Sequence, residues 1–573
     1  MWLREMTIRN FRKIKLLTVT FPHGLTVLVG ENNSGKTTII DALRLILFSS
    51  RDFDSLRLSE DDFRAGTDFE PIEISCRFTG LTDEDEVHLQ ECLVDIGDGK
   101  FEMQMNLRAD FNRTTHRCNI RMWGGETDGG SIPSTLYDRF ATVYLQPLRD
   151  PERGLRPGQH SQISRLVDCL TPDDHQSKFE AIAQQANDAI RDLESVKQAK
   201  TDINEQMQSI AGPEMTQDTD LIFTDPTFRR IIAGLQPEIG GLPFGLNGLG
   251  YNNLIYTATT LGTLRKSDAF SHRSILVEEP EAHLHPHLQL LLLNHFSTVA
   301  SDRAKNEVQV IMSSHSPVLV SQAPIDSIVA VHEVEDNVTA VSICQIEIEP
   351  EVKRPKIKKK LQRYLDATRG ELFFARHILM VEGIAEALLL PVFAKIAGGS
   401  LKNSAVTIVN ADGINFNAFL PLFGEEKLCM PVVILTDGDA QDIGGSPTDT
   451  ALGLKEKESE IPNLKVEMSE ITFEHELARI PSLLPHMIDA LKELHPRIGS
   501  DLEEDLKTIV KQDDKANAFL KKFIDKEVSK GCYAQELALQ LEEATLTSKC
   551  IPQYIRDALR HLGVTQEEDA DDE

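Results

Sequence analysis

Short apolar runs alternate with amphipathic segments through the first half of the chain. Residues 25–30 (LTVLVG) form one such run, and residues 37–47 follow it with helical spacing, which predicts a buried strand leading into a helix. The apolar runs at 274–279 and 308–315 predict two more buried strands, separated by a helix that starts near Pro286. Further segments have the patterns of antiparallel strands and their turn: 71–79, 101–109 and 116–123, with 124–130 as the turn.

A long polar segment, residues 173–210, has amphipathic helical spacing and ends at Ala-Gly-Pro. A surface helical insertion explains this pattern, and so does a helical hairpin that mediates dimerisation. Both readings stay open at the level of the sequence.

The second half begins with a dense run of Lys and Arg at 353–376, followed by a new alternation of strands and helices. Apolar runs at 377–383, 405–413 and 431–439 predict a second parallel sheet, and the pattern becomes mostly helical from about residue 481. The fold class is therefore α/β with several domains. The predicted divisions are a head at 1–350 with a helical insertion at about 160–215, a basic helical linker at 351–375, a second α/β domain at 376–565 and an acidic tail at 566–573.

Composition and charge limit the cellular location and the binding partners that the sequence allows. No apolar run reaches the roughly 20 residues that span a bilayer, the first residues lack a secretory signal, and the eight cysteines contain no CxxC pair. We therefore expect a cytoplasmic protein that does not bind membranes. The net charge of −30 argues against general nucleic-acid binding. A DNA-binding role requires a local basic groove, for which 353–369 is the best candidate, or cations that neutralise clustered carboxylates.

Three strand-end motifs predict a nucleotide site. GENNSGKT (30–37) matches the P-loop pattern between a strand and a helix, so its backbone N–H groups would hold the phosphates of ATP, Lys36 would reach the β and γ oxygens, and Thr37 would hold Mg²⁺. Glu278 ends the next apolar strand near that Mg²⁺, Glu279 would polarise the attacking water, and His315 would sense the γ-phosphate. The nucleotide-binding residues predicted from this loop are Gly30, Asn32, Asn33, Ser34, Gly35, Lys36, Thr37 and Thr38.

Together these motifs resemble the ABC-type ATPase head of the SMC and RecF group, in which two heads sandwich ATP. The resemblance places Gly248 and Gly250, in LNGLGYNNLIY (246–256), in the signature loop that faces the partner's nucleotide, and it makes Gln146 a candidate metal-sensing residue. Asn247 replaces the usual serine and Glu278 the usual aspartate, which argues against fast turnover. The sequence HLHPH (283–287) fits a contact between heads better than a metal site.

A second group of carboxylates follows the strands of the C-terminal domain. Glu382 ends one apolar run, with Gly383 permitting a tight turn and Glu386 one helical turn further on, and Asp437 and Asp439 end another run. The carboxyl ends of parallel strands meet at one sheet edge, where α/β proteins bind ligands. Helix capping explains the glutamates taken alone, and a turn explains the aspartates. Four carboxylates together need a cation, and oxygen ligands favour Mg²⁺ or Mn²⁺.

Strand–Glu-Gly–helix followed by strand–Asp-x-Asp resembles the Toprim fold of topoisomerases, primases and nucleases. The resemblance makes Glu474, with Glu476 as a further candidate, part of the metal shell, and it gives Lys530 the role of stabilising charge on phosphate. Two cations about 4 Å apart would activate a water and stabilise the leaving oxygen.

An ABC-type head followed by a Toprim domain resembles the OLD (overcoming lysogenisation defect) family of ATP-linked nucleases. That resemblance implies metal-dependent DNA cleavage, ATP gating, self-association through the helical insertion, and a role in phage defence or DNA processing, with an accessory or trigger partner as a further possibility. Two alternatives remain. A topoisomerase or primase would share the carboxylates, but none of the seven tyrosines lies in a recognisable nucleophile motif. An ATP-switched DNA scaffold would carry an inert Toprim site.

Overall fold

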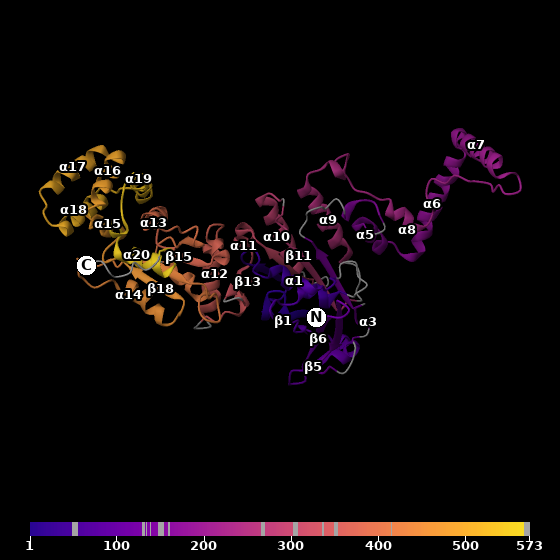
Figure 1. Cartoon of the computed structure of the whole chain (residues 1–573), viewed down its shortest axis with the longest axis horizontal. Helices are drawn as coiled ribbons and strands as arrows, with labels where there is room; N and C mark the ends of the chain where they lie inside the picture. Colours follow the sequence, from indigo (N-terminus) through magenta and orange to yellow (C-terminus); the bar gives the residue numbers. More distant parts are fainter. Residues whose placement is uncertain are drawn as a thin grey trace.

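The chain forms an elongated arrangement of two α/β regions and a projecting helical insertion (Figure 1). No helix in the described part of the chain is long and apolar enough to cross a membrane. The computed structural model describes residues 1–48, 56–128, 132, 134–137, 139–146, 154–158, 161–264, 270–282, 284–301, 308–334, 337–348, 353–413 and 415–565.

The first sheet of the head is antiparallel and has the strand order β2-β1-β4-β6-β5, with β7 paired to β6. The predicted strands at 71–79, 101–109 and 116–123 are β4, β6 and β7. The strands are β1 (Trp2–Phe11), β2 (Ile14–Thr20), β4 (Ile72–Thr79), β5 (Leu93–Asp95), β6 (Phe101–Asn112) and β7 (Arg117–Gly124). The short helix α2 (Asp83–His88) lies in the connection between β4 and β5.

The second sheet of the head has the order β14-β13-β3-β12-β11-β8, with all neighbours parallel except β13 and β14. Its central strand β3 is buried along its whole length, as its uninterrupted apolar run predicts. The strands are β3 (Leu25–Val29), β8 (Phe140–Leu145), β11 (His272–Glu278), β12 (Gln309–Ser314), β13 (Ile328–Val334) and β14 (Asn337–Ser342). The helices α1 (Lys36–Leu47), α3 (Ser134–Tyr137), α10 (Pro286–Ser301) and α11 (Pro317–Gln322) accompany them.

The helical insertion projects from the head at the end opposite the C-terminal helices (Figure 1). The predicted helical stretch at 173–210 is two helices rather than one, because the chain breaks helix at Asp192 and Leu193. The elements are α5 (Gln162–Leu170), α6 (Asp173–Arg191), α7 (Glu194–Ala211), α8 (Phe228–Ala233), β9 (Glu238–Ile239), β10 (Leu242–Pro243) and α9 (Leu249–Leu264).

The C-terminal domain is built on a parallel sheet of order β16-β15-β17-β18. Its strands are β15 (His377–Val381), β16 (Val406–Asn410), β17 (Val432–Thr436) and β18 (Leu464–Met468), the last of which the sequence pattern did not reveal. Its helices are α13 (Ile384–Ile396), α14 (Asp449–Glu456), α15 (Phe473–Ala478), α16 (Leu484–Leu494), α17 (Pro496–Lys507), α18 (Gln512–Asp525), α19 (Lys530–Glu543) and α20 (Gln553–His561). Helix α20 packs on β17 and β18.

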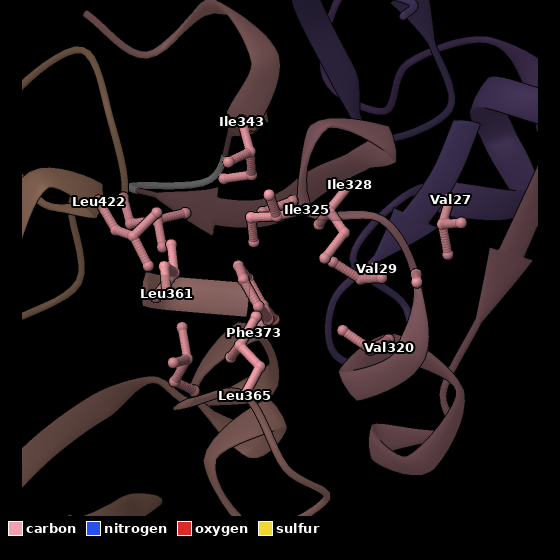
Figure 2. Close-up of a cluster of buried hydrophobic side chains, with 14 of the residues drawn as sticks. Val27, Val29, Val320, Ile325, Ile328, Ile343, Leu361, Leu365, Phe373 and Leu422 are labelled. Carbon is pink, nitrogen blue, oxygen red and sulfur yellow. The ribbon is translucent and has the colours of Figure 1, made fainter. Parts of the chain in front are cut away.

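The basic linker forms helix α12 (Arg354–Tyr364) and a 3₁₀ turn at Arg369–Phe374. Its apolar side chains Leu361, Leu365 and Phe373 are buried in one cluster with Val29 of β3 and Val320 of α11 (Figure 2). The same cluster continues into β15 and β17 of the C-terminal domain. Head and C-terminal domain therefore share a hydrophobic core through the linker rather than hanging on a free tether.

Candidate functional site

The P-loop takes the conformation that its glycines allow. Gly30 has φ +151°, and a Cβ there would lie 2.0 Å from the Val331 carbonyl oxygen, so any side chain would displace the loop from β13. Lys36 begins α1, and its Nζ donates to the carbonyl oxygens of Gly30 (2.9 Å) and Glu31 (2.6 Å). Burial lowers the pKa of Lys36 to about 8. The predicted nucleotide-binding residues from Gly30 to Thr38 thus form one continuous loop and helix start.

The predicted metal ligands of the ATPase site lie together. Glu278 ends β11, is buried, and accepts a hydrogen bond from the Tyr144 hydroxyl at 2.6 Å. The Thr37 side chain also bonds Glu278, while burial raises the pKa of the carboxyl. A buried carboxylate next to a P-loop threonine is the arrangement that a Mg²⁺ ion requires when nucleotide is bound.

Glu279 and His315 face each other across the ends of β11 and β12, with Glu279 Oε1 and His315 Nε2 3.4 Å apart. Burial and the nearby Lys36 lower the pKa of His315, so the ring is neutral at physiological pH. The sequence interpretation missed Glu281, whose Oε1 accepts from the His315 backbone N–H (2.6 Å) and the Ser314 hydroxyl (3.0 Å). Its signal was present, since it belongs to the same Glu-Glu-Pro-Glu segment.

The remaining predicted ATPase residues are on the surface. Gln146 is exposed at the end of β8, and Gly248 lies exposed immediately before α9, with open space where a side chain would project. Gly250 is in the first turn of that helix. Gly250 is half-buried, and the exposure of Gly248 agrees with a loop that would act on a second molecule. His283 lies outside the described residues, and His285 and His287 are exposed.

Glu382 and Asp437 lie at the same sheet edge, where β15 and β17 end. Glu382 Oε1 accepts from the Asp437 backbone N–H at 2.9 Å and from the Thr436 hydroxyl. Asp437 Oδ1 accepts from Ser469 Oγ at 3.0 Å. Thr436 and Ser469 are further site residues without a sequence signal of their own, because only the pairing of β15, β17 and β18 brings them to this edge.

Glu386 and Glu474 add two buried carboxylates to this edge, being 9% and 3% exposed. Lys530, the first residue of α19, places Nζ 2.9 Å from Glu474 Oε1, while Glu474 Oε2 is buried without a hydrogen-bond partner. Burial and the charges of Glu382, Glu474 and Glu386 raise the pKa of Asp437 well above its usual range. One lysine does not balance four carboxyl groups, so the edge is short of positive charge.

Two predicted carboxylates lie apart from this group. Asp439 is exposed in a turn at φ +50°, with its backbone N–H bonded to the Ile471 carbonyl. Glu476, the further candidate, forms an ion pair with Arg479 at 3.2 Å, which helps lower the pKa of the glutamate. Glu476 is therefore already neutralised by a protein cation, and Asp439 stands at the rim of the edge.

Gly383 does not form the predicted tight turn. Its φ of −147° is extended backbone, open to any residue. The absence of a side chain matters instead, since a Cβ there would lie 3.2 Å from Glu386 Oε2. The glycine therefore leaves room for the Glu386 carboxylate.

Divalent cations fit the chemistry of this edge. Among the described residues no three His, Cys, Asp or Glu side chains stand close enough together to hold an ion. The donors, however, are all oxygens, one buried carboxylate oxygen lacks a partner, and the negative charge is uncompensated, which suits hard cations such as Mg²⁺ or Mn²⁺. When bound, such ions would supply an activated water and charge neutralisation for phosphoryl chemistry.

Two family models match separate parts of the chain. The model described as an AAA ATPase domain matches residues 1–119 and 161–320. The model described as an overcoming lysogenization defect protein-like TOPRIM domain matches residues 373–439. The second match includes Glu382, Glu386, Asp437 and Asp439.

Three curated proteins are similar over most of their length. The OLD nuclease of Thermus scotoductus is 25% identical over 417 residues, covering 67% of this chain and 72% of that protein. The Old nuclease of Escherichia phage P2 is 23% identical, covering 72% and 73%. The endonuclease GajA of Bacillus cereus is 24% identical, covering 76% and 72%.

The chain therefore combines a match to an AAA ATPase domain with a match to an OLD-like TOPRIM domain. Its sequence is similar to those of the OLD nucleases. The family comparison thus supports a nuclease, and hence a hydrolase, as the class of enzyme. These domain families generally use ATP and a divalent metal.

Proposed function

We propose that this protein is an ATP-binding and ATP-hydrolysing, divalent-metal-dependent DNA endonuclease that cleaves phosphodiester bonds at its Toprim edge. The observation that carries the proposal is the convergence of Glu382, Glu386, Asp437 and Glu474 beside Lys530, with too little positive charge to balance them. An inert fold has no reason to maintain such a destabilising cluster.

The residues at this edge divide the work. Glu382 and Asp437, with Asp439 at the rim, would hold the cations, of which we propose two, and Glu386 and Glu474 would complete the shell. Thr436 and Ser469 fix the rotamers of the first two carboxylates through the hydrogen bonds described above. Lys530 would turn from Glu474 toward the phosphate and stabilise the negative charge that develops there.

The head would bind ATP with one Mg²⁺ held by Thr37 and Glu278. Lys36 would exchange its carbonyl partners for the phosphate oxygens, Glu279 would orient the attacking water, and His315 would contact the γ-phosphate. Gly248 is exposed before α9 and Gly250 is half-buried in its first turn, which suits nucleotide capture by a second copy. We therefore propose a homodimer, working in the cytoplasm in phage defence or DNA processing, and open to an accessory or trigger partner.

DNA would reach the Toprim edge along α12. Lys356, Lys359, Lys360 and Arg363 are exposed on this helix, which contains no acidic residue. Spacing of three, four and seven residues puts Lys356, Lys360 and Arg363 on one face. In a chain of net charge −30, this face is a local surface to which phosphates can be attracted.

Plasmid cleavage tests the proposal. Supercoiled plasmid is incubated with Mg²⁺ or Mn²⁺, with and without ATP, and wild type is compared with Asp437→Ala and with the matched control Asp442→Ala, an exposed aspartate in the following loop. We expect nicking or linearisation by wild type and Asp442→Ala, and loss of it in Asp437→Ala. Equal cutting by Asp437→Ala would remove the Toprim edge from the reaction. No cleavage by any of the proteins would contradict the endonuclease and favour the ATP-switched scaffold.

A further inference from the structure

The P-loop is contacted by a residue that belongs to the Toprim side of the molecule. Arg376 precedes the first Toprim strand, β15, and its Nε donates to both carboxylate oxygens of Glu31 at 2.9 and 2.8 Å. Glu31 is the second residue of the P-loop, and its carbonyl oxygen accepts the Lys36 ammonium at 2.6 Å. One glutamate therefore stands between the lysine of the ATP site and an arginine from the neighbouring domain.

Open space surrounds this pair on two sides. A cavity of about 560 Å³ is lined by Glu31, Asn32 and His315 of the ATPase site together with Arg376. A second cavity, of about 470 Å³, is lined by Glu31, Ser34 and Arg376. The Arg376 side chain is 67% exposed and that of Glu31 29%. The guanidinium thus lies beside the predicted phosphate-binding groups with room to reorient.

The charges favour such a reorientation when nucleotide binds. An exposed ion pair is weak, since solvent screens both partners. The phosphates of ATP bring several negative charges next to Glu31, and an arginine binds phosphate through short, charge-assisted hydrogen bonds. Lys36 is buried, its ammonium is held by the carbonyl oxygens of Gly30 and Glu31, and its single positive charge cannot neutralise the phosphates alone.

The other end of β15 carries the nuclease chemistry. The strand runs from His377 to Val381, so Arg376 and Glu382 flank it about 20 Å apart at roughly 3.3 Å per residue. The turn before Arg376 is fixed to the head, because a Cβ on Gly370 would lie 2.9 Å from the Pro317 carbonyl oxygen. Phe373 of the same turn packs in the junction core with Val320 (Figure 2). Arg376 therefore lies between a turn that packs against the head and the strand β15, which is paired with β16 on one side and β17 on the other.

We propose that Arg376 is a nucleotide-sensing residue of the ATP site. In the structure Arg376 binds Glu31. With ATP bound, the Arg376 guanidinium would contact the terminal phosphate of the ATP held by the same chain. This contact would shift the start of β15 and, through the strand, Glu382. The inference rests on the proposed function and names how nucleotide state would reach the nuclease edge.

Equilibrium binding of ATP and ADP tests the contact independently of DNA cleavage. Wild type, Arg376→Gln, Glu31→Gln and the double variant are titrated in the presence of Mg²⁺, with Arg497→Gln, an exposed arginine on α17, as matched control. We expect Arg376→Gln to weaken ATP binding about tenfold and ADP binding less than twofold. Glu31→Gln should strengthen ATP binding severalfold by releasing the arginine, and this gain should vanish in the double variant.

Equal losses for ATP and ADP, or additive effects of the two substitutions, would overturn the proposal, because a purely structural ion pair gives that result. A melting temperature of the nucleotide-free Arg376→Gln protein close to that of wild type checks its folding. In the plasmid assay, the ratio of cleavage rates with and without ATP should approach one in Arg376→Gln, and an unchanged ratio would overturn the coupling. If no protein cuts DNA, the endonuclease has failed while the binding result still decides the sensor.

Discussion

Single residues at both sites hold charges that the fold makes costly in the absence of ligand. Lys36 and Glu278 in the head, and Glu386 and Asp437 in the Toprim domain, are all shifted by burial in the direction that disfavours their charged forms. Bound phosphates and cations would remove that cost. The head therefore suits phosphates together with a cation, and the Toprim edge suits cations.

Lys36→Ala should abolish ATP hydrolysis, by on the order of a hundredfold or more, because no other ammonium group is held within the P-loop to meet developing charge on the phosphates. Phosphate release at saturating ATP measures this. An unchanged melting temperature without nucleotide would verify that the protein is folded. Retained hydrolysis in that variant would contradict the assignment of the P-loop.

His272 predicts a pH dependence of stability. The ring is fully buried, and burial lowers its pKa to about 3, whereas the unfolded chain takes up the proton near pH 6.5. The unfolded state therefore binds more protons below pH 6.5, and stability falls as the pH drops from 6.5 toward 3. Between pH 6.5 and 5 this histidine alone accounts for about 2 kcal/mol.

His272→Phe should remove that part of the pH dependence, because the neighbouring rings of Phe78 and Phe140 suit an aromatic replacement. Urea unfolding at pH 7.5 and pH 5 measures the difference. The exposed His287, changed to Phe, should leave the pH dependence as it is in wild type. His332, whose pKa burial lowers to about 4, acts in the same direction, so a smaller fall remains in the variant.

At the scale of elements, α12 combines two surfaces. Leu361 and its apolar neighbours join the two domains, whereas Lys356, Lys359, Lys360 and Arg363 face solvent. The same helix is thus a structural connector and the proposed DNA-binding surface. Lys358 is not free for that role, since it forms an ion pair with Asp326.

Replacing the four exposed basic residues of α12 by Gln should weaken DNA binding and flatten its salt dependence, with the slope of log K against log salt falling by about 3. Binding is measured in the Asp437→Ala background so that no substrate is cut. Four exposed lysines elsewhere in the C-terminal region provide a control of equal charge: Lys511, Lys521, Lys526 and Lys549. Equal losses of DNA affinity in the two sets would show that the effect comes from net charge and not from a binding surface on α12.

The local sequence pattern predicted the strands that end at the candidate site residues. The hydrogen-bond partners of those residues depend on how distant strands pair, which the local pattern does not show. The strands before Lys36, Glu278 and Glu382 were evident as uninterrupted apolar runs, and so were the carboxylates that follow them. The partners Thr436 and Ser469 were not, because nothing in their own neighbourhoods marks them. Tyr554 also could not be placed near the site from the sequence, because it belongs to no recognisable motif. It lies on α20, where its hydroxyl is buried without a hydrogen-bond partner and is close enough to Asp437 and Glu386 for their charges to raise its pKa.

At the scale of the whole molecule, helix α7 of the insertion leaves apolar residues uncovered. Helix α7 has no buried residue along its length. Ile203, Met207 and Ile210 are 39%, 39% and 81% exposed and lie at helical spacing on one face. An exposed apolar stripe on a projecting helix suits self-association better than solvent.

Ile203→Lys with Ile210→Lys should therefore shift the protein from dimer toward monomer, by more than tenfold in the dissociation constant. Light scattering coupled to size-exclusion chromatography measures the mass in solution. Thr201→Lys with Gln208→Lys, on the opposite face of α7, adds the same charge and should leave the dimer intact. A wild-type protein that is monomeric at all concentrations and with ATP would contradict the proposed dimer.

The position of α20 has a consequence for the cell during synthesis of the chain. The helix begins at Gln553 and packs on β17 and β18, which end at Thr436 and Met468. A ribosome thus translates every carboxylate of the Toprim edge well before the helix that covers the sheet behind them. Because domains generally fold as units, a growing chain that lacks α20 carries an incomplete Toprim domain. We therefore expect the Toprim edge to be complete only after the residues from Gln553 onward have left the ribosomal tunnel.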